Sequence, residues 1–193
     1  GECFLVVYAD DFIAGFQYPW EAERFYEQLR SRMAKFGLEL EENKSRIVES
    51  GRYLASLKAK RGESTRLGTF DFLGFTFYCG RTTKGNPWIM PKTSSKKFRQ
   101  KVKEIKIWLY NNKEQKLGKL MYMLNVKLVG HYRYYGISFN SRMISNYKQQ
   151  VRELLYKVLN RRSEKKSYTR EGFIEMMKYY KLVNPKIYYS LFC

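Results

Sequence analysis

The hydrophobic positions of this sequence change their spacing along the chain. Residues 4–8 and 12–16 are two short apolar runs, which predict the two strands of a hairpin. Residues 69–78 are rich in alternating aromatic side chains and 88–90 form a short apolar return, so a second hairpin is expected there. From residue 95 onward the apolar positions recur at steps of three and four, which is the period of amphipathic helices. The pattern predicts the α+β class.

The same periodicity predicts where the helices lie. One helix is expected over 19–36, opened by Pro19 and stopped by Gly37, and packed on the first hairpin. Short strands are expected over 38–40 and 46–48, and a loop over 49–68. In the aromatic stretch that follows, Gly74 marks a bulge or a close backbone approach. Further helices are expected over 95–112, from 117 into 129–136, from Ser141 as N-cap, and from Thr169 as N-cap, with Phe173, Ile174 and Met177 facing inward. We expect the aromatic tail over 185–192 to dock on this helical part.

The charge is unevenly divided between the two halves. The chain has 37 Lys and Arg against 18 Asp and Glu, a formal net charge of +19. Residues 1–93 hold 14 basic and 12 acidic side chains, whereas residues 94–193 hold 23 and 6. The shift predicts a boundary in the segment 91–94, with one domain over 1–93 and a basic helical domain over 94–193. An excess of this size indicates a polyanionic partner, either nucleic acid or an anionic membrane surface.

Several classes of protein are disfavoured by the sequence. It has no apolar run near the roughly 20 residues that span a bilayer, and no signal peptide, so we expect an intracellular protein, cytoplasmic in a bacterium or within an organelle. No helix has the strong Trp, Phe and Leu face of a lipid anchor, which favours nucleic acid over membrane. Cys3, Cys79 and Cys193 are widely spaced and form neither a disulfide framework nor a zinc motif. Because the first residue is not Met, we expect a longer parent protein.

Asp10 and Asp11 are the main candidates for chemistry. They lie between the two apolar runs, at the tip of the first hairpin. Hard divalent cations such as Mg²⁺ take oxygen ligands of this kind, usually one or two carboxylates together with substrate phosphates. The alternative is that they are ordinary turn residues, because Asp is common in hairpin turns.

The basic helices are the main candidates for binding. The helix over 95–112 carries six cations in eleven residues, which favours phosphate contacts over a merely solvated face: Lys96, Lys97, Arg99, Lys101, Lys103 and Lys106. Among the many tyrosines, Tyr132, Tyr134 and Tyr135 are those we expect to stack on bases. The one histidine, His131, lacks the partners of a metal site and is expected to be structural.

Four motifs in this order resemble one family. They are Tyr8-Ala9-Asp10-Asp11, Phe72-Leu73-Gly74-Phe75, the run from Gly130 to Gly136, and the run from Leu159 to Ser163. Together they resemble the C-terminal part of group II intron-encoded reverse transcriptases, or maturases. The resemblance implies the end of a reverse-transcriptase palm, built of antiparallel hairpins and one helix, followed by an all-helical thumb and maturase domain X. The family pattern has Trp where this sequence has His131.

The resemblance also implies roles for particular residues. Asp10 and Asp11 become catalytic Mg²⁺ ligands, Tyr8, Ala9 and Lys44 nucleotide-binding residues, and 72–75 a primer grip. The further RNA-binding residues implied on domain X are Arg133, Arg161, Arg162, Lys165 and Lys166, beside the helix cations and tyrosines named above. The implied partners are intron RNA, an RNA template with a DNA primer, and a deoxynucleoside triphosphate in the complete enzyme.

Two interpretations follow. In one, the parent protein is an RNA-directed DNA polymerase that also assists splicing. This chain alone is then expected to be inactive, because the fingers and the first catalytic Asp are absent from it. Another polypeptide, with fingers and palm, would complete the site. In the other, the chain is a non-enzymatic RNA-binding splicing module in which the palm remnant is only scaffold.

Overall fold

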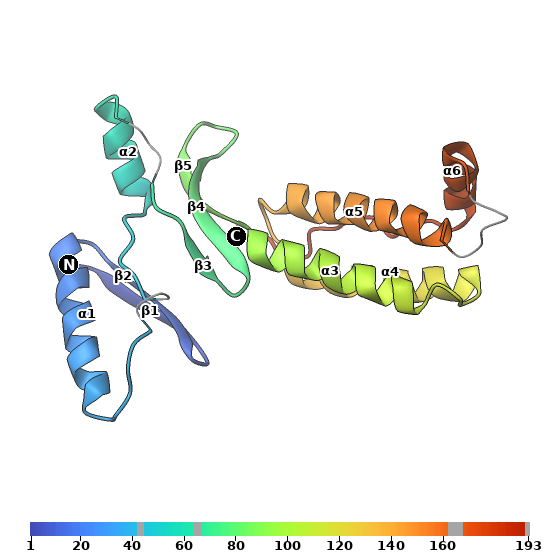
Figure 1. The fold of residues 1–193 in the computed structure, drawn as a ribbon. Coiled ribbons are helices and arrows are strands. Elements are labelled where there is room, and N and C mark those ends of the chain that lie inside the picture. Colours follow the sequence, from blue (N-terminus) through green and yellow to red (C-terminus); the bar gives the residue numbers. More distant parts are fainter. Residues whose placement is uncertain (42–44, 64–66, 162–167, 192–193) are drawn as a thin grey trace. The chain divides into compact units, whose positions relative to one another are not determined.

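The computed structural model describes residues 1–41, 45–63, 67–161 and 168–191. They divide into two compact units. The first consists of Gly1–Leu73 and Phe77–Ile89, and the second of Gly74–Thr76 and Met90–Cys193. The described residues contain two small antiparallel sheets and six helices, which confirms the α+β class (Figure 1).

The first unit begins with the predicted hairpin. Strands β1 (Cys3–Tyr8) and β2 (Asp11–Phe16) pair antiparallel, with Cys3 opposite Phe16 and Tyr8 opposite Asp11. Helix α1 (Pro19–Ala34) packs on β2, where the rings of Phe16 and Phe25 lie 5.1 Å apart. The helix therefore packs on the hairpin as expected. It ends two residues earlier than predicted, since Gly37 turns the chain after the C-cap with φ of 68°.

Two predictions for the following segment are wrong. Residues 38–40 and 46–48 form no strand, because neither triplet has a pairing partner among the described residues. The predicted loop over 49–68 contains helix α2 (Arg52–Lys60), which buries Ala55. The guanidinium of Arg52 lies 4.5 Å from the ring centre of Trp88, a cation–π contact that joins this helix to the second sheet.

The second sheet has three strands in the order β3-β4-β5: β3 (Phe70–Phe72), β4 (Phe75–Arg81) and β5 (Pro87–Thr93). The alternating aromatics that predicted this hairpin pack against each other, as Phe70 and Phe77 do at 5.2 Å. The stretch that we expected to be one strand is two strands, because a tight turn at Leu73 and Gly74 separates β3 from β4.

Four helices build the second unit: α3 (Ser95–Asn111), α4 (Leu117–Tyr135), α5 (Ser141–Leu159) and α6 (Arg170–Tyr179). Helix α5 packs against both α3 and α4 (Figure 1). The inward stripes that the spacing predicted make up most of the core, namely Ile105, Leu109, Leu120, Leu124, Leu128, Ile144, Val151, Leu155 and Val158. In α6 Phe173 is buried as predicted. The other buried residue is Met176, whereas Met177 is half-buried and Ile174 is exposed.

The helix caps agree only in part with the sequence. Thr169 caps α6 as predicted, since its side chain accepts a hydrogen bond from the Gly172 amide. Ser141 is the first helical residue of α5 and not its cap, because the N-cap position is taken by Asn140.

The aromatic tail docks through its backbone, as expected. The amides of Tyr188 and Tyr189 both donate to the Gly136 carbonyl, at 2.7 and 3.1 Å, and Ser138 donates to Tyr189. A β-carbon on Gly136 would lie 2.4 Å from the Lys186 carbonyl oxygen, so only glycine permits this approach.

Candidate nucleic-acid interface

The turn between β3 and β4 is the first motif that the structure positions. Leu73 and Gly74 both have positive φ, at 49° and 79°, the combination that a two-residue hairpin turn of type I′ requires. Gly74 therefore forms the turn itself and no bulge. The expected close approach is present, since a β-carbon on Gly74 would lie 3.2 Å from the Tyr135 hydroxyl oxygen.

This turn is fixed to the start of the basic helix α3. The Ser94 amide donates to the Gly74 carbonyl at 2.9 Å, and the Ser94 hydroxyl accepts from the Lys97 amide at 3.3 Å as the helix N-cap. A β-carbon on Gly74 would lie 3.5 Å from the Lys97 side chain. Within the second unit, Gly74 and the first cations of α3 are thus brought together, although they are more than twenty positions apart in the chain.

Aromatic rings of α4 pack against the residue that follows this turn. Phe75 lies 6.0 Å from Tyr134 in a stacked pair and 5.3 Å from Tyr135 in a tilted one. Tyr134 is 54% exposed, whereas Tyr135 is buried and Tyr132 has no exposed surface. The expectation that Tyr132 and Tyr135 stack on bases is therefore wrong for this fold, because their rings are used in the core. Tyr134 keeps an accessible ring.

Four of the α3 cations form one stripe. They follow each other at steps of three, four and three, so they share a face that is offset from the buried Ile105 and Leu109, and all four are exposed: Lys96, Arg99, Lys103 and Lys106. At 1.5 Å per residue the stripe is about 15 Å long. Lys97 is exposed beside it.

Lys101 differs from the other cations of α3. Its amine donates to Glu104 at 2.8 Å, and Gln100 donates to the same carboxylate at 2.9 Å. The hydrogen bond from Lys101 is the largest of the contacts that lower the pKa of Glu104, with burial opposing it. Lys101 is thus partly neutralised by the one acid of this helix, and it offers less charge to a phosphate than its neighbours do.

The remaining predicted cations are spread over the second unit. Arg133 is exposed near the end of α4. Arg161, just beyond α5, donates from Nη1 to the Tyr110 hydroxyl oxygen at 2.7 Å, which holds its guanidinium against α3. Lys44, Arg162, Lys165 and Lys166 lie outside the described residues.

His131 is part of an aromatic cluster inside the helices. Its ring stacks on Tyr147 at 3.7 Å and lies 4.7 Å from Tyr135. Burial is the main cause that lowers the pKa of His131 to about 4, with a smaller effect from the charge of Lys101. A neutral, packed imidazole agrees with the structural role expected for it.

The acidic hairpin of the first unit is exposed. Ala9 and Asp10 form the two-residue turn, with Ala9 at a φ of 53°, and Asp11 begins β2 opposite Tyr8. Both carboxylates face solvent, at the tip where the sequence placed them. No group of three or more His, Cys, Asp or Glu side chains that might share a metal ion occurs among the described residues. The hairpin therefore supplies two carboxylates of a metal site at most.

Two features of the second unit were not predicted from the sequence. Asn140 is fully buried between β5 and α5. From the sequence alone, an asparagine between two helices is indistinguishable from an exposed loop residue. On α4, Tyr122 and Val126 lie outside the core stripe and are exposed. The step of four between them predicts a second apolar face on that helix.

The model of one known family matches this unit. The group II intron, maturase-specific domain matches residues 95–180, which run from the first residue of α3 to the residue after α6. The searches of curated proteins and of solved structures gave no match. None of the helices in the described part of the chain is both long and apolar enough to cross a membrane. Residues 95–180 are thus similar to the group II intron, maturase-specific domain, as the sequence motifs predicted, and this similarity supports an involvement of the chain in RNA binding and group II intron splicing.

Proposed function

We propose that the chain is the C-terminal part of a group II intron-type RNA-directed DNA polymerase, which binds intron RNA and template-primer and assists splicing. The observation that carries the proposal is the stripe of exposed cations on α3, within the segment that matches the maturase-specific domain. Lys and Arg side chains that neutralise phosphates release counterions, and this supplies most of the affinity of such surfaces.

The α3 stripe and the neighbouring turn serve as one RNA and primer contact. The proposal is supported by their rigid connection, because the Ser94 amide holds the Gly74 carbonyl at 2.9 Å and Phe75 packs on Tyr134. In this role Lys96, Arg99, Lys103 and Lys106 bind phosphates, and the exposed ring of Tyr134 stacks on a base. The turn over 72–75 then acts as the primer grip of the resemblance.

The acidic hairpin belongs to a polymerase site in this proposal. In this role Asp10 is a direct Mg²⁺ ligand, Asp11 is an auxiliary acid, and Tyr8 and Ala9 contact the incoming nucleotide, as the resemblance implies. A two-metal site needs ligands for two ions about 4 Å apart, and the described residues offer only this exposed pair. The donor set therefore fits part of such a site, and no catalytic step is assigned to these residues alone.

The surface of β1 supports a partner for this hairpin. Its side chains from Phe4 to Tyr8 are apolar on both faces and all are exposed, and in the described residues β1 pairs only with β2. A strand that is apolar on both faces is typical of one covered on both sides. We include in the proposal a fingers and palm polypeptide, in the same parent protein or in a second one, that covers β1 and completes the carboxylate set.

The alternative is a non-enzymatic splicing module in which the hairpin is only scaffold. It is favoured by the incomplete carboxylate set. Primer extension with Mg²⁺, an RNA template and a DNA primer distinguishes the two when the chain is assayed alone and together with a fingers and palm polypeptide of a group II intron protein. Synthesis that requires the added polypeptide and is abolished by Asp10→Ala supports the polymerase. No synthesis in either case supports the module.

RNA binding is tested separately. We expect tight binding of structured intron RNA that weakens steeply with salt, with Asp10→Ala unchanged because Asp10 lies outside the basic unit. Equal affinity of the chain for intron RNA and for an unrelated duplex of the same length would contradict a splicing role.

A further inference from the structure

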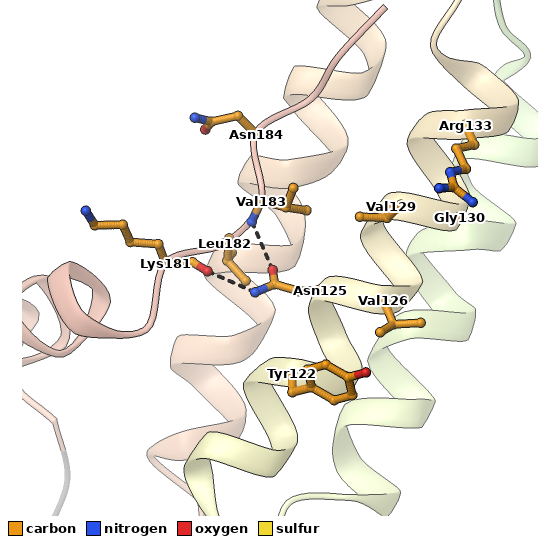
Figure 2. Close-up of a pocket in the computed structure, with 10 residues that line it drawn as sticks. All are labelled: Tyr122, Asn125, Val126, Val129, Gly130, Arg133, Lys181, Leu182, Val183 and Asn184. Atoms are coloured by element: carbon orange, nitrogen blue, oxygen red, sulfur yellow. Dashed lines mark hydrogen bonds between the residues drawn. The ribbon is translucent and has the colours of Figure 1, made fainter. Parts of the chain in front are cut away.

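A groove runs along the second unit between α4 and the segment over 181–184. It has a volume of about 760 Å³, which is within the range of pockets that hold small molecules (Figure 2). Asn125 fixes its two sides, since its side-chain amide donates to the Lys181 carbonyl at 2.9 Å and its carbonyl accepts from the Val183 amide at 2.9 Å. Because both sides are tied, the groove is preformed.

The lining combines an apolar surface with positive charge. Tyr122 is 71% exposed and Val126 56% exposed, and both lie on the α4 side (Figure 2). Arg133 lies farther along the same helix and Lys181 at the opposite side, and no lining residue is acidic. An aromatic ring with a flanking guanidinium and amine is the composition that binds single-stranded nucleic acid.

Gly130 lies in this groove, within α4, and the fold gives no reason for it. A β-carbon built there meets no atom within 4 Å, and the residue is exposed. Glycine in a helix interior lowers stability relative to alanine, so a glycine without a packing role calls for another explanation. A molecule that passes close to the helix backbone at this point supplies one, because any side chain would stand in its way.

We propose that this groove holds a short single-stranded segment of RNA. One base stacks on Tyr122, the strand passes over Gly130, and a phosphate binds Arg133. Tyr122 and Arg133 are eleven residues apart, about 16 Å along the helix, which is too far for one nucleobase and suits a segment of strand. The inference rests on the proposed RNA binding, and it assigns single-stranded RNA to this groove.

The test uses the full chain with four variants. Tyr122→Ala removes the stacking ring, and its matched control Tyr179→Ala removes a tyrosine of α6 that is 85% exposed and outside the groove. Gly130→Leu fills the groove, and its matched control Gly118→Leu changes the other exposed glycine of α4, where a β-carbon meets only the Tyr180 ring at 3.8 Å. Gly130→Leu raises the melting temperature, because leucine favours the helix, so lost binding cannot be attributed to unfolding.

The first probe is a fluorescein-labelled single-stranded RNA of eight nucleotides, and the second is structured intron RNA. We expect Tyr122→Ala and Gly130→Leu each to weaken binding of the octamer by at least about fivefold relative to their controls. An octamer carrying 5-iodouridine should form its photo-crosslink at Tyr122.

The outcomes separate this inference from the proposed function. If the chain binds intron RNA but either groove variant binds the octamer like its control, the groove is not an RNA site; that result is also expected if a protein segment occupies it. If the wild-type chain fails to bind the octamer, the inference is likewise overturned. Absence of intron RNA binding by the wild-type chain contradicts the proposed function itself.

Discussion

Asn140 is the residue whose removal should most damage the second unit without touching its charge. Its side chain makes three hydrogen bonds in a fully buried place: it accepts from the Thr93 amide and donates to the Thr93 hydroxyl and to the Tyr135 carbonyl, all at 2.8 Å. It therefore joins the end of β5 to the end of α4. Each such bond contributes about 1 kcal/mol net, and the abandoned partners are buried. We predict that Asn140→Ala lowers the unfolding free energy by about 3 kcal/mol.

The assay is urea unfolding followed by circular dichroism at 222 nm, because helices α3 to α6 supply most of that signal. Asn146→Ala is the matched control, since Asn146 is exposed on α5 and alanine favours the helix there. A loss below about 1 kcal/mol for Asn140→Ala, at an unchanged dependence on urea concentration, would refute the assignment of these three bonds as structural.

Three further predictions concern the cluster around α4. In the folded chain His131 has a pKa of about 4, whereas in the unfolded chain it takes up a proton below about pH 6.5. Acidification from pH 7 to 5 should therefore lower the unfolding free energy by about 2 kcal/mol. His131→Phe, which cannot titrate, should lose this pH dependence when unfolding is measured across that range, and an unchanged dependence of the unfolding free energy on pH would contradict the prediction. The Tyr132 hydroxyl is buried without a hydrogen-bond partner among the described residues, so Tyr132→Phe should raise the unfolding free energy by about 1 kcal/mol, and destabilisation would reveal a partner. Gly74→Ala should lower the melting temperature, because alanine is strained at a φ of 79° and its β-carbon would lie 3.2 Å from the Tyr135 hydroxyl oxygen; an unchanged melting temperature would show that the turn relaxes.

Periodicity predicted the helical unit well because its core is made by regular stripes. Leu120, Leu124 and Leu128 recur at steps of four, and such a spacing allows one buried face. The first unit was predicted less well. Helix α2 was missed because the cations Lys58 and Lys60, close to Gly62, indicated a loop although more than half of the helix is apolar, and its one buried side chain is the small Ala55.

The candidate site shows where sequence reasoning ends. Spacing placed Lys96, Arg99, Lys103 and Lys106 on one face, and composition showed that the face is positive. The sequence did not reveal which tyrosines are buried, because Tyr132, Tyr134 and Tyr135 are the same residue type and differ only in the tertiary contacts that bury two of them. The hydrogen bond between Ser94 and Gly74 likewise depends on tertiary structure, and it joins motifs that the sequence shows only as separate.

The central claim is that the α3 stripe binds RNA phosphates. It is tested most directly by the salt dependence of intron RNA affinity for two double variants of equal net charge, Lys103→Glu with Lys106→Glu on the stripe, and Lys35→Glu with Lys60→Glu on exposed sites of the first unit. Loss of two phosphate contacts should reduce the slope of log K against log salt by about 1.5 for the stripe variant, and the control variant should keep the wild-type slope. Equal slopes for the two variants would contradict the claim, because the affinity would then depend on total charge and not on this face of α3.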